Sequence, residues 1–167
     1  MPSNTVYRGS DGTISVATEA GPEGDKAAAV NEQYSLTPIG RATGVTVRVH
    51  SDLKPFHELG QRLPTELRPG NVNVYGSIDR AYINGALLKL MLGDAADQRP
   101  AGTFISPSFN LSLRLENPSL PGSTSTVTVI GVKLEDWYYT LPEDDFVMER
   151  VRFRALWVKV DDATASA

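Results

Sequence analysis

Residues 146–160 read FVMERVRFRALWVKV, and this stretch decides the fold. Apolar and arginine side chains alternate through it, and a period of two places alternate residues on opposite faces of a β-strand. We therefore expect one long strand with an apolar face toward a core and a basic face away from it. The apolar face would hold Val151, Phe153, Ala155 and Trp157, and the basic face Arg150, Arg152 and Arg154.

Other stretches repeat this pattern or are rich in Val, Thr and aromatic residues. They are residues 43–50, 71–78, 108–115 and 124–139, and residues 13–18 could add a short strand. Strands outnumber helices and do not alternate with them. This favours an antiparallel sandwich or barrel with a helix on its flank over a parallel α/β sheet.

One real helix is expected, over residues 79–92. Asp79 is a plausible N-cap and Gly93 a plausible stop. The body of the helix is apolar almost all round, so its own sheet or a neighbouring subunit must cover it. Its candidate contact residues are Leu87, Leu88 and Met91. Residues 26–33 are expected to form a helical turn at most.

Residues 51–70 contain three prolines, at 55, 64 and 69. Proline lacks the backbone donor that helices and central strands need. We therefore expect an ordered loop here, between two strands. The domain organisation follows: an arm over residues 1–35, a β-domain over 36–160 and a small polar tail over 161–167 that frays.

The composition restricts the classes of function. The chain has 167 residues, a net charge of −4 and no cysteine, and it has no run of 18 apolar residues. One domain is expected, without disulfides, thiolate metal sites or a membrane-spanning helix. An acidic chain also has no overall electrostatic attraction for nucleic acid.

Residues suited to catalysis are few. The two histidines, His50 and His57, have no metal-ligand spacing, and the acidic run 143–145 lacks the pattern of a calcium loop. Nucleophile, dinucleotide and phosphate-loop motifs are absent. We therefore expect no enzyme, no cofactor and no metal site. Residues 137–139, Trp-Tyr-Tyr, point alternately to two faces, which favours packing and subunit contact over one flat stacking surface.

The stripe Arg150, Arg152 and Arg154 has three explanations that the sequence leaves open. Like charges on one strand face repel one another unless water or partners screen them. Acidic residues of a neighbouring subunit, a solvated face and a nucleic-acid contact would each do so.

Two segments of the chain resemble tail tube proteins of tailed phages and contractile injection systems. The first, residues 63–94, has Leu63-Pro64, then ELRPG over 66–70, then GSIDRAY over 76–82 and NGALL over 84–88. The second, residues 131–154, has a strand with Trp137, then LPEDDF over 141–146 and the final strand. The resemblance covers roughly residues 43–160.

The resemblance implies two packed antiparallel sheets that form a barrel-like sandwich with one flanking α-helix. It also implies homohexameric rings that stack into a hollow tube in the virion tail. DNA would pass through the lumen without specific binding, and the partners would include sheath, baseplate and tail terminator proteins. Assembly would take place in the host cytoplasm.

Under this interpretation, the arm and the loop 51–70 contact neighbouring rings. The contact residues expected in the loop are Pro64, Glu66, Arg68 and Pro69. Two alternatives remain: an adhesin-like or lectin-like β-sandwich that binds through Trp137 and Tyr139, and another virion component such as a decoration or tail terminator protein.

Overall fold

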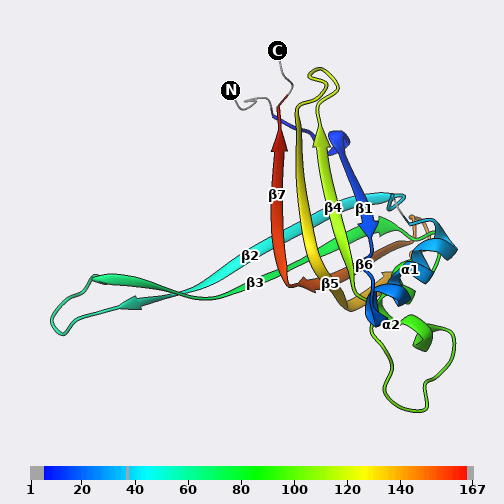
Figure 1. Cartoon of the computed structure of the whole chain (residues 1–167), viewed down its shortest axis with the longest axis horizontal. Helices are drawn as coiled ribbons and strands as arrows, with labels where there is room; N and C mark the ends of the chain where they lie inside the picture. Colours follow the sequence, from blue (N-terminus) through cyan, green and yellow to red (C-terminus); the bar gives the residue numbers. More distant parts are fainter. Residues whose placement is uncertain (1–5, 37, 165–167) are drawn as a thin grey trace.

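The computed structural model describes residues 6–36 and 38–164. In this part of the chain, strands form most of the structure and two α-helices lie at one end of it (Figure 1). The strands are β1 (Gly12–Ala17), β2 (Ala42–Phe56), β3 (Glu66–Ala81), β4 (Phe109–Glu116), β5 (Thr124–Thr140), β6 (Met148–Ala155) and β7 (Trp157–Ala163). The helices are α1 (Pro22–Tyr34) and α2 (Ala86–Leu92), with short 3-10 turns at Gly9–Asp11 and Gly93–Ala96.

The strands form one antiparallel sheet in the order β1-β4-β5-β6-β3-β2, and β7 also pairs with β5. Strand β5 joins the two parts, because its first half pairs with β4 and β7 and its second half with β6. It bends at Gly131, whose φ of 70° suits glycine. The mainly β class with a flanking helix is confirmed, but the strands form one curled sheet where two packed sheets were expected.

The core lies between the inner face of this sheet and the two helices. Helix α1 starts with Pro22, which suits the first turn, and ends where Ser35 turns to a φ of 53°. It buries Ala27 and Val30, so the expectation of a mere turn at 26–33 was wrong. The strands contribute Ile14, Val16, Val74, Ile78, Phe109, Leu111, Val129, Val132, Leu134, Val151 and Phe153.

Helix α2 begins at Ala86, so the expected start at residue 79 was wrong. Asp79 is still in β3, where it pairs in register with Arg150 of β6. The helix starts where the Asn84 side-chain oxygen accepts a hydrogen bond from the Ala86 backbone N–H at 3.1 Å. The cap signal at Asp79 was therefore overridden by pairing within the sheet.

The expected loop over residues 51–70 is the outer part of a long β2–β3 hairpin, which projects far from the rest of the molecule (Figure 1). Strand β6 pairs with β3 only from Val74 inward, so the outer hairpin has just two strands. Both are edge strands there, and an edge strand tolerates proline because its N–H side can face water. The three prolines thus argued against a central strand but not against this one.

The expected final strand is two strands, β6 and β7, which separate at Leu156. The Leu156 side chain lies over Gly131, where an added Cβ would be 2.6 Å from it. Trp157 then starts β7 and is half exposed, so it does not share the buried face of Phe153. The expectation of one long strand was wrong in this respect. The break at Leu156 ends the alternation, so Trp157 does not lie on the buried face.

Both ends of the chain contribute to the sheet in the described residues. Residues 12–17 form β1, which pairs with β4 and buries Ile14 and Val16. Residues 161–163 complete β7. Residues 1–5 of the expected arm and 165–167 of the expected tail lie outside the described part. Contacts of the arm with neighbouring rings remain a prediction.

Candidate assembly surfaces

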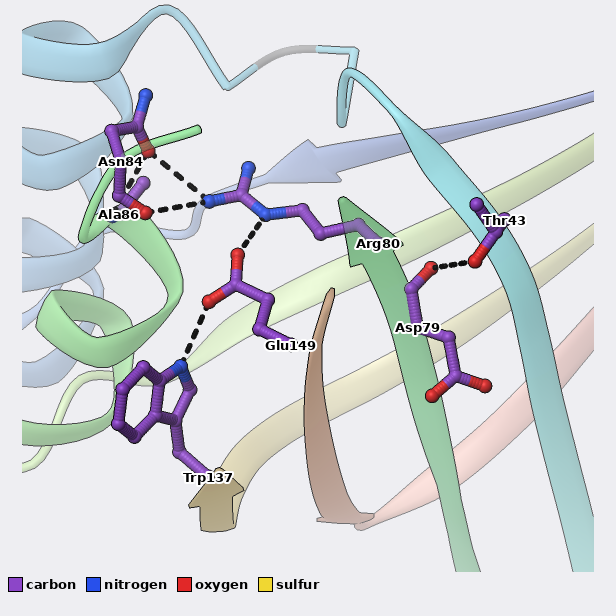
Figure 2. A network of polar contacts seen from close by, with 7 residues as sticks. All are labelled: Thr43, Asp79, Arg80, Asn84, Ala86, Trp137 and Glu149. Carbon is purple, nitrogen blue, oxygen red and sulfur yellow. Dashed lines mark hydrogen bonds and ion pairs between the residues drawn. The ribbon is translucent and has the colours of Figure 1, made fainter. Parts of the chain in front are cut away.

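A buried polar network fixes the end of the sheet that carries α2 (Figure 2). Arg80 on β3 donates through Nε to the Glu149 carboxylate on β6, and both side chains are fully buried. Arg80 Nη2 also donates to the backbone and side-chain oxygens of Asn84, each at 3.1 Å. Trp137 Nε1 on β5 donates to the other Glu149 oxygen at 2.8 Å. Because no charged atom of the pair reaches water, the network holds strands together and is closed to ligands.

The arginine stripe lies on the exposed face of the sheet, and each arginine pairs with a carboxylate of its own chain. The hydrogen bond to Asp79 raises the pKa of Arg150 above its ordinary value. Arg150 Nη2 donates to Asp79 at 3.1 Å, Arg152 Nε to Asp136 at 2.9 Å and Arg154 Nε to Glu135 at 2.8 Å. We call the six residues of these three pairs the arginine ladder. Repulsion within the stripe is therefore relieved inside the subunit, without a neighbour.

The outer β2–β3 hairpin has one apolar face. Alternation and register place Val49, Leu53, Leu67 and Val72 on the side of the sheet that faces the core further in. Each is more than half exposed, because the core ends before it reaches them. We call these four residues the hairpin apolar face. Nothing in the described part of the chain covers this face.

The opposite face of the hairpin is polar apart from the exposed Phe56. His50 and Asp52 lie 3.1 Å apart on β2, and Arg68 pairs with Glu66 at 2.9 Å on β3. Register places Arg48 in one row with Tyr75 and, through β3, with Arg154 of the ladder. The polar face of the hairpin therefore continues the face that carries the arginine ladder.

Comparison with known proteins shows which solved structures share this fold. No family model and no curated protein matches the sequence. Among solved structures, a chain of the sheath–tube complex of the extracellular contractile injection system PVC, in its extended state, superposes with a TM-score of 0.63 at 10% identity, covering 95% of this chain and 93% of that one. The SPP1 tail tube superposes with a TM-score of 0.58 at 11% identity, covering 96% and 81%. The fold is that of tail tube proteins.

A third solved structure matches equally well. It is a chain of the PVC sheath/tube terminator, with a TM-score of 0.62 at 12% identity, covering 95% of this chain and 98% of that one. At such identities the likeness concerns the fold. It confirms the resemblance that residues 63–94 and 131–154 indicated.

The structure places the predicted contact residues of this tail tube fold in two different settings. Pro64, Glu66, Arg68 and Pro69 are all exposed on the projecting hairpin, with Pro64 in its turn. Leu87 of α2 is in the core of its own subunit, 1% exposed, while Leu88 and Met91 are half-buried. The hairpin residues are therefore available to a neighbour, and on α2 only Leu88 and Met91 are partly so. Their role as contacts remains a prediction.

Residues considered for chemistry are scattered. His50 and His57 both lie on the exposed hairpin, and the 143–145 acidic run is an exposed turn between β5 and β6. Within residues 6–36 and 38–164, no three His, Asp or Glu side chains gather in a way that could hold a metal ion. No helix there has the length and apolar character needed to cross a membrane.

Sequence reasoning missed two features of these surfaces. The hairpin apolar face was not predicted, because the three prolines of residues 51–70 indicated a loop. The alternation of apolar Val49 and Leu53 with polar His50 and Asp52 was the signal that could have revealed it. The buried Arg80–Glu149 pair gave no signal, because isolated charges in a strand ordinarily indicate its wet face.

Proposed function

We propose that the chain is the structural subunit of a tail tube, which assembles into stacked hexameric rings that form a hollow conduit for genome delivery. The observation that carries the proposal is the uncovered apolar face of the projecting hairpin. The proposed location is the virion tail, after assembly in the host cytoplasm. The solved structures of similar fold come from a sheath–tube complex, a tube terminator and a tail tube, so sheath, baseplate and terminator proteins are the proposed partners.

The hairpin is built in a way that a lone subunit would not tolerate well. Its apolar face exposes four large side chains and its two strand edges are unpaired, and such edges aggregate unless something covers them. A neighbouring copy would bury the hairpin apolar face and pair its edges. Ring contacts of this kind are heterologous and close by rotation, whereas stacking of rings continues without closing. Both contacts repeat identically in a tube.

The two faces of the sheet support an orientation for the subunit in the ring. The inner face is apolar and covered by α1 and α2, and it continues outward as the hairpin apolar face. The outer face is polar and carries the arginine ladder. In this proposal the apolar side packs against protein and the ladder face lines the water-filled lumen. DNA passes over it without specific contacts.

The proposal includes no catalytic step. The one buried pair of ionisable side chains, Arg80 and Glu149, has no access to solvent among the described residues. Trp137 donates to Glu149 and packs against the core, and Tyr139 is stacked on Tyr82 at 5.3 Å between ring centroids. These aromatic side chains therefore already serve the fold, which weakens the adhesin-like alternative.

A tail terminator is the second candidate function. Its support is specific, because the terminator chain superposes as well as the sheath–tube chain does, with TM-scores of 0.62 and 0.63. A terminator would form the same ring but would close the end of a tube made by another protein. The two candidates therefore differ in whether the chain stacks on itself.

Electron microscopy of negatively stained, purified protein tests both candidates. A tube subunit gives tubes of uniform width, whose end views show six-fold rings. A terminator gives single rings that do not lengthen at any protein concentration. A protein that stays monomeric at high concentration contradicts both, and the sedimentation coefficient of the same sample reports it independently.

A further inference from the structure

The arginine ladder has an ordered geometry that the tube assignment does not explain. Three arginines stand on alternate positions of β6, about 7 Å apart along the strand. Each meets a carboxylate from a strand beside it, with Asp79 on β3 and Asp136 and Glu135 on β5. The arginine side chains are 47–66% exposed and the carboxylates 30–41% exposed. The ladder therefore lies at the surface, open to any large ligand.

The pairs matter little for stability. Exposed ion pairs gain little from Coulomb attraction, because water and salt screen them and the long side chains lose freedom. The three ion pairs affect the electric field above the sheet more than they affect stability. Arginine spaced along a groove or stripe is the side chain that binds phosphate groups best, because its planar fork donates two hydrogen bonds at once. Without the carboxylates, the stripe would be a binding surface for a phosphate backbone.

The remaining charges on this face leave it close to neutral. Arg48 and Lys133 share a row with Arg154, and the Lys133 ammonium bonds to Glu23 of α1 at 2.8 Å. The acidic excess of the chain lies elsewhere, on α1, in the 143–145 turn and at the end of β7. The net charge of −4 therefore does not describe the ladder face.

We propose that Asp79, Glu135 and Asp136 mask a latent polyanion-binding site formed by Arg150, Arg152 and Arg154. With the carboxylates in place, each guanidinium is paired with a negative charge of its own chain and the face has no net attraction for a nucleic acid. The role of this masking rests on the proposed function. A conduit must let a polyanion slide, and three unmasked arginines in every subunit would retain it. The masking itself belongs to the single subunit.

The test is a binding measurement with a matched control. One variant carries Asp79→Asn, Glu135→Gln and Asp136→Asn, which removes three negative charges from the ladder. The control carries Glu143→Gln, Asp144→Asn and Asp145→Asn, which removes the same charge from the exposed turn. Fluorescence anisotropy of a labelled 20-nucleotide single strand, and of the duplex, reports binding by the unassembled subunit at low salt.

We expect the ladder variant to bind both oligonucleotides at least about tenfold more tightly than wild type. The slope of log Kobs against log salt concentration should be steeper by about 2–3. Wild type and control should bind weakly and alike. Adding Arg152→Gln to the ladder variant should remove much of the gain, and unchanged circular dichroism verifies the fold of each variant. Equal binding by ladder variant and control, or tight binding by wild type, overturns the proposal.

The result separates the masking from the tube assignment. If the wild-type protein forms tubes but the ladder variant gains no affinity, the masking is wrong and the proposed function stands. If the ladder variant gains affinity but no rings form under any condition, the masking stands and the tube assignment fails.

Discussion

Arg80 and Glu149 form an ion pair with both side chains fully buried, in a subunit whose other carboxylate–arginine pairs lie at the surface. The pair connects β3 to β6, and through Trp137 it reaches β5. Arg80 also holds Asn84, whose side chain starts α2. One cluster therefore positions three strands and a helix, at the end of the molecule opposite the hairpin tip (Figures 1 and 2).

Removing one member of this pair should destabilise the subunit strongly. Glu149→Leu leaves the Arg80 guanidinium buried without its anion, which costs about 3–5 kcal/mol of unfolding free energy. Arg80→Met combined with Glu149→Leu should cost clearly less than the sum of the two single changes, because no uncompensated charge remains. Urea denaturation of the unassembled subunit measures all three. Additive losses would show that the pair is not coupled.

Gly76 should not tolerate a side chain. A Cβ there would lie 2.0 Å from the Thr46 carbonyl oxygen and 2.7 Å from the Phe153 ring, so β2 or the core must move. Gly76→Ala should lower the unfolding free energy by about 1–3 kcal/mol. Gly40→Ala is the control, because its Cβ meets nothing within 4 Å, and it should stay within about 0.5 kcal/mol of wild type. A similar loss in both variants would contradict the close packing of β2 on β3.

The sequence predicts the part of this fold that repeats locally. Alternation in residues 146–155 identifies β6 and assigns Val151 and Phe153 to the core, because a period of two is visible without knowledge of the neighbours. It cannot show which strand lies beside β6. The carboxylates that pair with its arginines lie 16 to 71 residues away along the chain, and only the sheet register brings them together.

Three of the errors share a physical cause, since tertiary contacts overrode a local signal in each of them. Asp79 resembles a helix cap but sits in the sheet opposite Arg150. Pro55 and Pro69 resemble loop residues, but they lie in the outer hairpin. There the strands are edge strands, which tolerate a missing backbone N–H because that side can face water. Trp157 continues the apolar alternation in sequence, yet the contact of Leu156 with Gly131 separates β6 from β7.

The hairpin apolar face should be needed for assembly but not for folding. Leu53→Ser together with Leu67→Ser removes the two leucines of this face and leaves Val49 and Val72, and neither leucine belongs to the core. The subunit should keep its circular dichroism and melting temperature while rings and tubes disappear, since the neighbour loses its apolar contact. Sedimentation velocity and negative-stain microscopy measure the two properties. Lys54→Ser on the opposite face is the control, and tubes of normal length in the double variant would refute the contact.

The apolar residues of α2 should separate into two kinds. Leu87 is 1% exposed, so Leu87→Ala should cost about 2–5 kcal/mol of unfolding free energy, whatever the state of assembly. Leu88 is half-buried, so Leu88→Lys should affect the isolated subunit little but weaken assembly if a neighbour covers it. Urea denaturation and sedimentation distinguish the two effects. Normal assembly of the Leu88 variant would restrict the interface to other surfaces.

An exchange of charge across the ladder tests whether Arg152 also serves a neighbouring subunit. Arg152 lies 2.9 Å from Asp136 of its own chain, so Arg152→Asp combined with Asp136→Arg keeps an ion pair in the same register. If the arginine stripe contacts acidic residues of another copy, the exchange places a like charge against them. Rings should then dissociate at lower salt than wild-type rings, and sedimentation across a salt series measures this. Assembly that equals wild type at every salt concentration would show that the pair acts within one subunit only.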